Sequence, residues 1–305
     1  MINVTVIGFG NVGSSLTLLL LNNKHPLRLN IMEPDESAVG GFIDLAHAIP
    51  LYQQKELFIN NEDLFLSAHF IYFTAGTPNK KNTSRLTTAQ QNKELAKEIF
   101  NHRSFLKNPF VIVITNPVDI VSYAVYQYSG LPAERVIGTG TLLDSVRLAY
   151  YLSTLSGNYA NDFDALVLGE HGSSQVPIYS LTKLKGKPIL EDSTFTTKKL
   201  ELVKQLTEGA AAQIRKTQTG TTYGVAKCAE VLLDYLLGEE EHTLPLSMLT
   251  NEFYRELLQL NQNIYISSLA SIKNGEVKIN NSINLSNEEL EAYRKSAAII
   301  ASLSN

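Results

Sequence analysis

The sequence contains a single cysteine, Cys228, among its 305 residues. One cysteine excludes a disulfide within the chain and any zinc site that needs several thiolates, and it suits a reducing compartment. Long apolar runs are also missing, because no stretch approaches the roughly 20 residues that a membrane-spanning helix needs. The leucine-rich N-terminus lacks the pattern of a signal peptide, since no cation precedes Lys24 and glycines interrupt the run. We therefore expect a cytoplasmic protein with no membrane partner.

An excess of positive charge is absent as well. The chain has 26 Lys and Arg against 30 Asp and Glu, which gives a formal net charge of -4. Such a chain has no basic field to attract a phosphate backbone, so its charge argues against nucleic acid as a partner and favours small molecules. Hydrophobic residues make up 44% and charged residues 18% of the sequence, which is the composition of an ordinary folded protein.

The first part of the chain alternates short β-branched or apolar runs with longer helical patterns. The predicted strands are 3–8, 27–32, 69–74, 110–115 and 135–138, and the helices between them are 11–23, 35–48, 86–102 and 118–129. This alternation predicts βαβ units and an N-terminal Rossmann domain, a doubly wound parallel sheet of the α/β class. Ligands of such sheets bind at the carboxyl ends of the strands.

The regular alternation of strands and helices ends near residue 140, and the pattern that follows predicts a C-terminal α+β domain. Its predicted elements are helices at 141–155, 196–216, 221–237 and 286–302, a strand at 163–168, and a hairpin of 266–272 with 277–280. Asn274-Gly275 is a strong two-residue turn signal for that hairpin, and Ser286 is a suitable cap for the last helix. We expect two domains, residues 1–139 for a cofactor and residues 140–305 for a substrate.

The segment VIGFGNVGSS carries a G-x-G-x-x-G pattern at Gly8, Gly10 and Gly13, directly after a predicted strand and at the start of a helix. Glycines there let the backbone approach a pyrophosphate at the helix N-terminus. Glu33 follows Gly13 by 20 residues, at the end of the next strand, where a carboxylate can accept hydrogen bonds from ribose hydroxyls and would repel a 2′-phosphate. The pattern predicts NAD rather than NADP; a purely structural turn and a solvated strand end are the alternatives.

A second group of residues suggests acid–base chemistry. His171 lies in a glycine-flanked turn after a predicted strand, and histidine can exchange the proton that accompanies hydride transfer. Asp144 and Arg147 share one face of a predicted helix. The aspartate could orient a histidine, and the arginine could bind a substrate carboxylate through two hydrogen bonds. Alternatively, Asp144 and Arg147 form no more than a surface ion pair.

Together these segments resemble the L-lactate and malate dehydrogenase family, and within it the lactate and L-2-hydroxyisocaproate dehydrogenases rather than the malate enzymes. The matching segments, in the family's order, are VIGFGNVGSS, DLAHA, TAG, SRL, ITNPVDI, VIGTGTLLDSVRL, LGEHGSSQVP and TTYGVA. The resemblance implies an NAD-dependent enzyme that interconverts 2-hydroxy and 2-oxo acids, needs no metal, and assembles as a homodimer or homotetramer. Lactate is the first substrate we expect, and larger 2-hydroxy acids are the second.

The resemblance also implies roles for individual residues. His171 corresponds to the proton donor and acceptor, Asp144 to its partner, and Arg147 to the carboxylate-binding arginine. Arg85 matches an arginine on a loop that closes over the substrate and polarises its carbonyl, and Asn116 matches an amide that orients that carbonyl and also contacts the cofactor. Further residues match positions that line the substrate pocket or contact the cofactor: Thr221 for the substrate, and Asn11, Val12, Thr74, Ala75, Gly76 and Val225 for the cofactor.

The chain departs from the family's pattern at three places. Six residues before the loop arginine, lactate enzymes carry glutamine and malate enzymes arginine, whereas this chain has Asn79. Asparagine cannot pair a second carboxylate, so malate should be a poor substrate, and its short side chain leaves room for larger groups. The loop has Lys81 and Asn82 where proline and glycine are common. Ala149 and Asp164 replace the cationic residues that bind fructose 1,6-bisphosphate in activated bacterial enzymes, which predicts no activation through that site.

Two other functions fit parts of the sequence. An NAD-dependent glycosidase on a related fold would need a cysteine and a histidine at a metal site, but Cys228 has no histidine near it in sequence, and the GEHG segment would be unexplained. A catalytically silent NAD-binding protein would have no use for Arg85, Asp144, Arg147 and His171 together.

Overall fold

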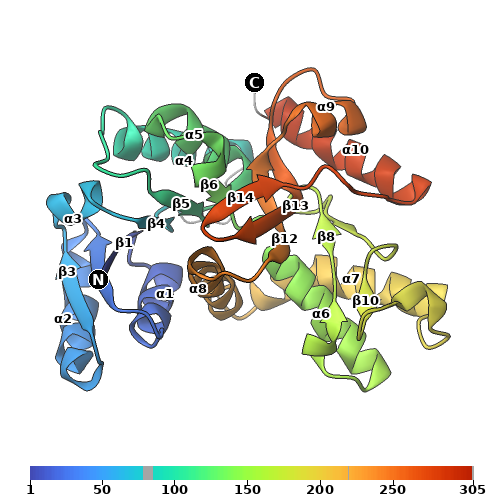
Figure 1. Ribbon diagram of the computed structural model, residues 1–305, viewed down its shortest axis with the longest axis horizontal. Helices are drawn as coiled ribbons and strands as arrows, with labels where there is room; N and C mark the ends of the chain where they lie inside the picture. Colours follow the sequence, from blue (N-terminus) through green and yellow to red (C-terminus); the bar gives the residue numbers. More distant parts are fainter. Residues whose placement is uncertain (78–84, 219, 304–305) are drawn as a thin grey trace. The chain divides into compact units, whose positions relative to one another are not determined.

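The computed structural model describes residues 1–77, 85–218 and 220–303. The chain forms two compact units (Figure 1): Met1–Gly138 with Thr222–Gly238, and Thr139–Thr221 with Glu239–Asn305. The sequence analysis assigns every residue after 139 to the second domain. In the structure, however, the helix that follows Thr222 folds with the first unit, although it lies more than 80 residues further along the chain.

The first unit contains a parallel sheet in the order β6-β5-β4-β1-β2-β3. Its strands are β1 (Ile2–Ile7), β2 (Leu27–Met32), β3 (Lys55–Ile59), β4 (Phe70–Phe73), β5 (Phe110–Val113) and β6 (Val136–Gly138). From β1 the chain builds outward through β2 and β3, then crosses over and builds in the other direction through β4, β5 and β6. This is the doubly wound topology that the sequence predicts, so the fold class is confirmed.

Helices cover both faces of this sheet: α4 and α5 lie on one face and α1 and α8 on the other (Figure 1). The helices are α1 (Asn11–Leu21), α2 (Val39–Ala48), α3 (Glu62–Leu66), α4 (Arg85–Phe100), α5 (Val118–Ser129) and α8 (Tyr223–Leu237). All residues of the central strands β4 and β5 are buried, as expected for a sheet enclosed by two helical layers.

The second unit combines an antiparallel sheet with helices. The antiparallel strands are β12 (His242–Leu249), β13 (Tyr265–Lys273) and β14 (Glu276–Ile279), and the short strands are β7 (Phe163–Asp164), β8 (Val167–Leu168), β9 (Val176–Pro177), β10 (Lys183–Leu184) and β11 (Lys187–Pro188). The helices are α6 (Leu142–Ser156), α7 (Thr197–Ile214), α9 (Glu252–Leu258) and α10 (Asn287–Leu303). Helices α6 and α7 pack side by side, and α10 packs against α9, β9 and β13.

Two local predictions in this unit are confirmed. The β13–β14 hairpin turns at Asn274 and Gly275, whose φ angles are 51° and 71°, the positive values that a two-residue hairpin turn requires. Ser286 caps α10, because its Oγ accepts from the Glu289 N–H at 3.2 Å while the Glu289 carboxylate accepts from the Ser286 N–H at 2.9 Å. This reciprocal pair is a capping box.

Other elements differ from the sequence predictions. The expected strand at 163–168 is two short strands with different partners: β7 pairs with β10, whereas β8 pairs with β9. Strand β12 is not predicted because Pro245 interrupts its apolar run, and β3 is not predicted because it is a half-exposed edge strand without a continuous apolar pattern. Within the described ranges, no helix is long and apolar enough to cross a membrane.

Candidate functional site

The glycine-rich turn between β1 and α1 is packed too closely for side chains at two of its three glycines. Gly8 has a φ of 93°, and a Cβ added there would lie 2.6 Å from the Ala75 backbone. A Cβ at Gly13 would lie 2.0 Å from the Gly8 carbonyl oxygen. At Gly10, by contrast, a Cβ would meet no atom of the described protein within 4 Å. Protein packing therefore explains Gly8 and Gly13, whereas Gly10 borders open space.

That open space belongs to a cavity of about 770 Å³ in the first unit, at the carboxyl ends of the parallel strands. Residues of four strand ends line it, and they include most of the predicted cofactor positions: Gly8, Gly10, Glu33, Thr74, Ala75 and Gly76. We call this set of six residues the cofactor edge. The Thr74 hydroxyl joins two of its loops, because it donates to the carbonyl oxygens of Ile7 and Gly8, each at 2.9 Å.

Glu33 follows β2 and points its carboxylate at the glycine-rich turn. Its Oε2 accepts from the Phe9 N–H at 2.8 Å, and its Oε1 accepts from the Asp35 N–H at 3.0 Å. The backbone of Glu33 is held by Asn60, whose Oδ1 accepts from the Glu33 N–H and whose Nδ2 donates to the Glu33 carbonyl oxygen. A carboxylate has about four acceptor positions, so Glu33 keeps capacity for the hydroxyls of a ribose.

The cavity also has walls that the sequence analysis missed. Asn60 directly follows β3, a strand that was not predicted. Because the carboxyl ends of parallel strands meet at one edge of the sheet, a prediction of β3 would also have placed Asn60 at the cavity. Phe65 and Arg103 form another part of the wall, with the guanidinium 5.3 Å above the ring and bonded to Glu62 at 3.1 Å. Helix α4 contributes Leu95, Glu98 and Ile99.

These features fit a dinucleotide. The N-terminus of α1 supplies backbone N–H groups and a positive dipole end for a pyrophosphate, and Gly10 leaves the room that such a group needs. Glu33 supplies a carboxylate at the position where a ribose is recognised. In the part of the chain that the structure describes, no group of three or more His, Cys, Asp or Glu residues could hold a metal ion.

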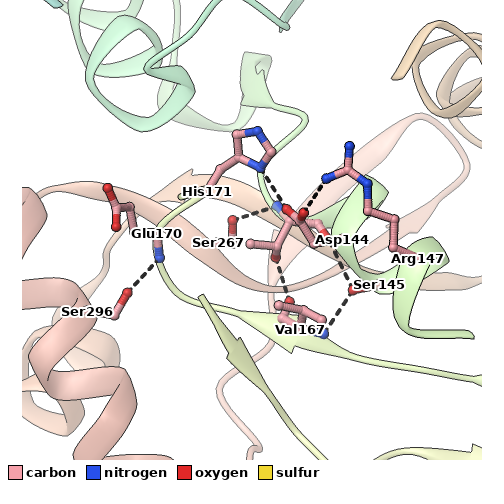
Figure 2. A network of polar contacts seen from close by, with 9 residues as sticks. Asp144, Ser145, Arg147, Val167, Glu170, His171, Ser267 and Ser296 are labelled. Carbon is pink, nitrogen blue, oxygen red and sulfur yellow. Dashed lines mark hydrogen bonds and ion pairs between the residues drawn. The ribbon is translucent and has the colours of Figure 1, made fainter. Parts of the chain in front are cut away.

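In the second unit, Asp144 binds both of the residues that the sequence associates with it (Figure 2). Its Oδ2 lies 2.7 Å from His171 Nδ1, and its Oδ1 accepts from Arg147 Nη1 at 2.8 Å. The exposed fractions of the three side chains are 2% for Asp144, 11% for Arg147 and 25% for His171. The surface ion pair that the sequence left open is therefore a buried pair, and the same carboxylate also binds the histidine.

The electrostatics of this group favour an ionised Asp144. Burial alone would raise the pKa of its carboxyl, but the charges and hydrogen bonds of His171 and Arg147 outweigh burial and hold the pKa below its ordinary value. An ionised carboxylate can only accept, so His171 carries a proton on Nδ1. The tautomer is thereby fixed, and Nε2 is the ring nitrogen at which a proton can be exchanged.

Buried hydroxyl groups hold the segments that carry Asp144 and His171. Ser267, on β13, accepts from the Thr141 N–H through its Oγ at 2.9 Å, at the start of the helix that carries Asp144. Thr141 Oγ1 donates to the Val167 carbonyl oxygen at 2.5 Å, and Ser145 Oγ accepts from the Val167 N–H at 2.9 Å. Val167 lies on β8, the strand that leads to His171. Its carbonyl oxygen and its N–H group are thus both bonded to residues at the start of α6.

Helix α10 supports the turn that contains His171. Ser296 is fully buried, and its Oγ accepts from the Glu170 N–H at 2.8 Å (Figure 2). Its Oγ also lies 3.1 Å from Ser174 Oγ, and the Ser174 hydroxyl donates to the Glu170 carboxylate. Ser174 lies in the segment LGEHGSSQVP but has no assigned role there, and Ser296 is more than 120 residues from His171 in the sequence, so neither serine was predicted.

The remaining predicted residues are distributed over both units. In the first unit, Asn11 and Val12 begin α1, Asn116 follows β5, and Val225 lies in the first turn of α8. Arg85 begins α4, but its side chain lies outside the described part of the structure, and so does Asn79. Thr221 is a half-buried residue of the second unit.

Comparisons with known proteins agree on one family. Family models match residues 2–138 as the NAD-binding domain of lactate/malate dehydrogenase and residues 141–303 as its alpha/beta C-terminal domain. L-lactate dehydrogenase 1 of Listeria monocytogenes is 31% identical over 298 residues, which cover 96% of this chain and 93% of that protein.

Solved structures give the same picture. A lactate dehydrogenase from a Medee basin deep-sea metagenome library matches with a TM-score of 0.90 and 28% identity, covering 99% of this chain and 98% of that chain. Malate dehydrogenase of Cryptosporidium parvum matches with a TM-score of 0.88 and 25% identity, covering 100% of this chain and 98% of that chain. NAD is therefore the cofactor, and the chain belongs to the lactate/malate dehydrogenase family of NAD-dependent 2-hydroxy acid oxidoreductases.

Proposed function

We propose that the chain is an L-lactate dehydrogenase that reduces pyruvate to L-lactate with NADH in the cytoplasm, with residues 1–139 supplying most of the cofactor site and residues 140–305 most of the substrate site. The observation that carries the proposal is the Asp144 carboxylate, which binds a histidine on one side and an arginine on the other. A 2-oxo acid needs both partners, a proton donor for its carbonyl oxygen and a cation for its carboxylate.

When bound, NADH supplies the hydride that reaches C2 of the oxo acid. His171 gives the proton on Nε2 to the carbonyl oxygen, which completes the hydroxyl group, and takes it back in the reverse reaction. Asp144 stabilises the charged imidazole before that transfer and keeps its ring oriented. Arg147 holds the substrate carboxylate through guanidinium N–H groups other than the one bonded to Asp144.

Four further residues complete the proposed site. Arg85 polarises the carbonyl, Asn116 orients it, Thr221 lines the substrate pocket, and Val225 packs against the nicotinamide. Loss of a donor such as Arg85 would cost about 2.7 to 4 kcal/mol of transition-state stabilisation. These assignments follow from the positions of the residues in the matching segments SRL, ITNPVDI and TTYGVA.

The proposed substrate preference depends on Asn79. Its amide cannot pair the second carboxylate of oxaloacetate, which argues against a malate dehydrogenase. Its short side chain favours, as the second candidate, a dehydrogenase of larger 2-oxo acids such as 2-oxoisocaproate. The proposed enzyme assembles as a homodimer or homotetramer.

The test is NADH oxidation with pyruvate, 2-oxoisocaproate, phenylpyruvate and oxaloacetate. The proposal expects the highest kcat/KM with pyruvate, and a preference for 2-oxoisocaproate would support the second candidate. Oxaloacetate as the best substrate would contradict the role of Asn79, and no reaction with any of the four would contradict the proposed activity.

The same assay tests regulation by fructose 1,6-bisphosphate. Ala149 is buried on α6 and Asp164 is exposed on β7, and neither side chain can bind a phosphate. We expect the half-saturating pyruvate concentration to stay the same when the bisphosphate is added. A decrease on addition would show that another site binds the activator.

A further inference from the structure

Asn92 lies on α4 with only 1% of its surface exposed, and it is not part of any motif that the family resemblance uses. A buried primary amide is costly unless both of its ends find partners. The oxygen and the nitrogen of the Asn92 amide each have a hydrogen-bond partner, and these partners lie on two different loops at the carboxyl edge of the parallel sheet.

The first partner belongs to the loop after β4. Asn92 Oδ1 accepts from the Thr77 N–H at 2.9 Å. Thr77 lines the cofactor cavity, and it is followed in the sequence by the segment 78–85, which carries Asn79 and Arg85. The bond therefore fixes the backbone of the loop after β4 at Thr77.

The second partner belongs to the loop after β5. Asn92 Nδ2 donates to the Asn116 carbonyl oxygen at 2.6 Å. The neighbouring Thr115 hydroxyl donates to the carbonyl oxygens of Ala75 and Phe73, at 2.7 Å and 3.1 Å. The two loops are thus bonded to each other at Thr115 and to helix α4 at Asn92.

The fit around these bonds is close. A Cβ added to Gly76 would lie 2.7 Å from Thr115 Cγ2 and 3.4 Å from both terminal atoms of the Asn92 amide. With so little space, the amide cannot be replaced by a longer one without moving a loop. Aspartate has the right size but cannot donate to the Asn116 carbonyl oxygen when ionised, and leucine can make neither bond.

We propose that Asn92 is a positioning residue, which holds Asn116 in register with Thr77 of the loop after β4. This inference rests on the proposed function for the role of Asn116. Asn92 itself contacts neither substrate nor cofactor in this account. Its effect is to keep Asn116, which orients the substrate carbonyl, at a fixed position relative to the loop after β4 that lines the cofactor cavity.

Two substitutions separate the two bonds. Asn92→Asp keeps the acceptor for Thr77 and loses the donor to Asn116, whereas Asn92→Leu loses both. For Asn92→Asp we expect KM for the 2-oxo acid to rise about tenfold, with a lower kcat, while the Kd of NADH stays within about threefold of the unmodified protein. Gln90→Ala is the matched control, because it removes an amide on the solvent side of the same helix.

A second measurement needs no substrate. Exchange of the Thr77 amide hydrogen, followed by NMR, should be slow in the unmodified protein and in Asn92→Asp, and at least about tenfold faster in Asn92→Leu. If Asn92→Leu does not fold, slow exchange in the unmodified protein and in Asn92→Asp still supports the Thr77 bond, and fast exchange in either overturns it.

Failure of the Asn92 inference can be distinguished from failure of the proposed function. If the unmodified protein reduces no 2-oxo acid, the proposed function fails while the exchange experiment still tests the two-loop connection. The inference is overturned if folded Asn92→Asp retains the KM of the unmodified protein. It is also overturned if Asn92→Asp raises KM and the Kd of NADH by the same factor, since that would indicate general loosening of the sheet edge.

Discussion

The cofactor edge of the first unit and the His171–Asp144 pair of the second unit are held in place by different means. At the cofactor edge, close packing of main-chain atoms fixes the glycine-rich turn against the loop after β4, where Ala75 lies. The His171–Asp144 pair joins residues 27 positions apart, and hydroxyl groups from β13 and α10, more than 90 residues further on, hold the two segments that carry it.

This difference explains where each part is sensitive to change. A backbone turn tolerates no added atom at its crowded positions, because main-chain atoms cannot move aside as a flexible side chain can. A pair of side chains tolerates changes in its surroundings only as long as every buried donor and acceptor keeps a partner. Four substitutions test this contrast.

The largest effect is expected for Asp144→Asn. The substitution removes the charge that stabilises the imidazolium and lets the amide present a donor to His171 Nδ1, which favours the wrong tautomer. We expect kcat to fall about 10³-fold, measured with saturating NADH and oxo acid. Asp164→Asn, an exposed carboxylate of the same unit, is the control and should leave kcat unchanged. Loss of less than about tenfold in Asp144→Asn would argue that Asp144 is structural only.

Two glycine substitutions test the glycine-rich turn at the cofactor edge. In Gly13→Ala the new Cβ would overlap the Gly8 carbonyl oxygen, and we expect the free energy of unfolding in urea to fall by about 3 kcal/mol. Gly10→Ala meets no protein atom within 4 Å, so its stability should change by less than about 1 kcal/mol while NADH binding weakens. If Gly10→Ala bound NADH as tightly as the unmodified protein, the pyrophosphate would not approach the turn at Gly10.

The smallest effect is expected for Ser267→Ala. The substitution leaves the Thr141 N–H without its acceptor, which should cost about 1 to 3 kcal/mol of stability and lower kcat about tenfold because the Asp144 helix shifts relative to His171. Ser268→Ala is a matched control: Ser268 is the next residue of β13 and is also fully buried, but it bonds Ile266 and Tyr293 instead. Equal losses of kcat in both variants would refute a specific role for Ser267.

The same contrast decides how much could be predicted from the sequence. The Rossmann sheet, Gly8, Gly13 and Glu33 follow from local spacing, and the pairing of Asp144 with Arg147 follows from one helical turn. Ser267, Ser296 and Asn92 could not be predicted, because a serine or asparagine acquires its role only when the fold brings a distant backbone group to it. Single residues of these common types carry no pattern of their own in one sequence.

Two elements were missed for physical reasons as well. The edge strand β3 is partly exposed along most of its length, so its sequence KELFI lacks the continuous apolar pattern of the central strands, and Asn60 at its end was missed with it. Helix α8 was predicted as a helix, but its packing against α1 in the first unit was not, because this tertiary contact is not encoded in the helix's own sequence.

The most direct test of the division between the two units is His171→Asn, assayed for NADH binding by fluorescence titration and for turnover with pyruvate. Asparagine cannot exchange a proton near neutral pH, so we expect turnover to fall by at least about 10²-fold. NADH should still bind within about threefold of the unmodified affinity, because the cofactor edge belongs to the first unit. Turnover that survives the substitution, or NADH binding that is lost together with turnover, would contradict the account.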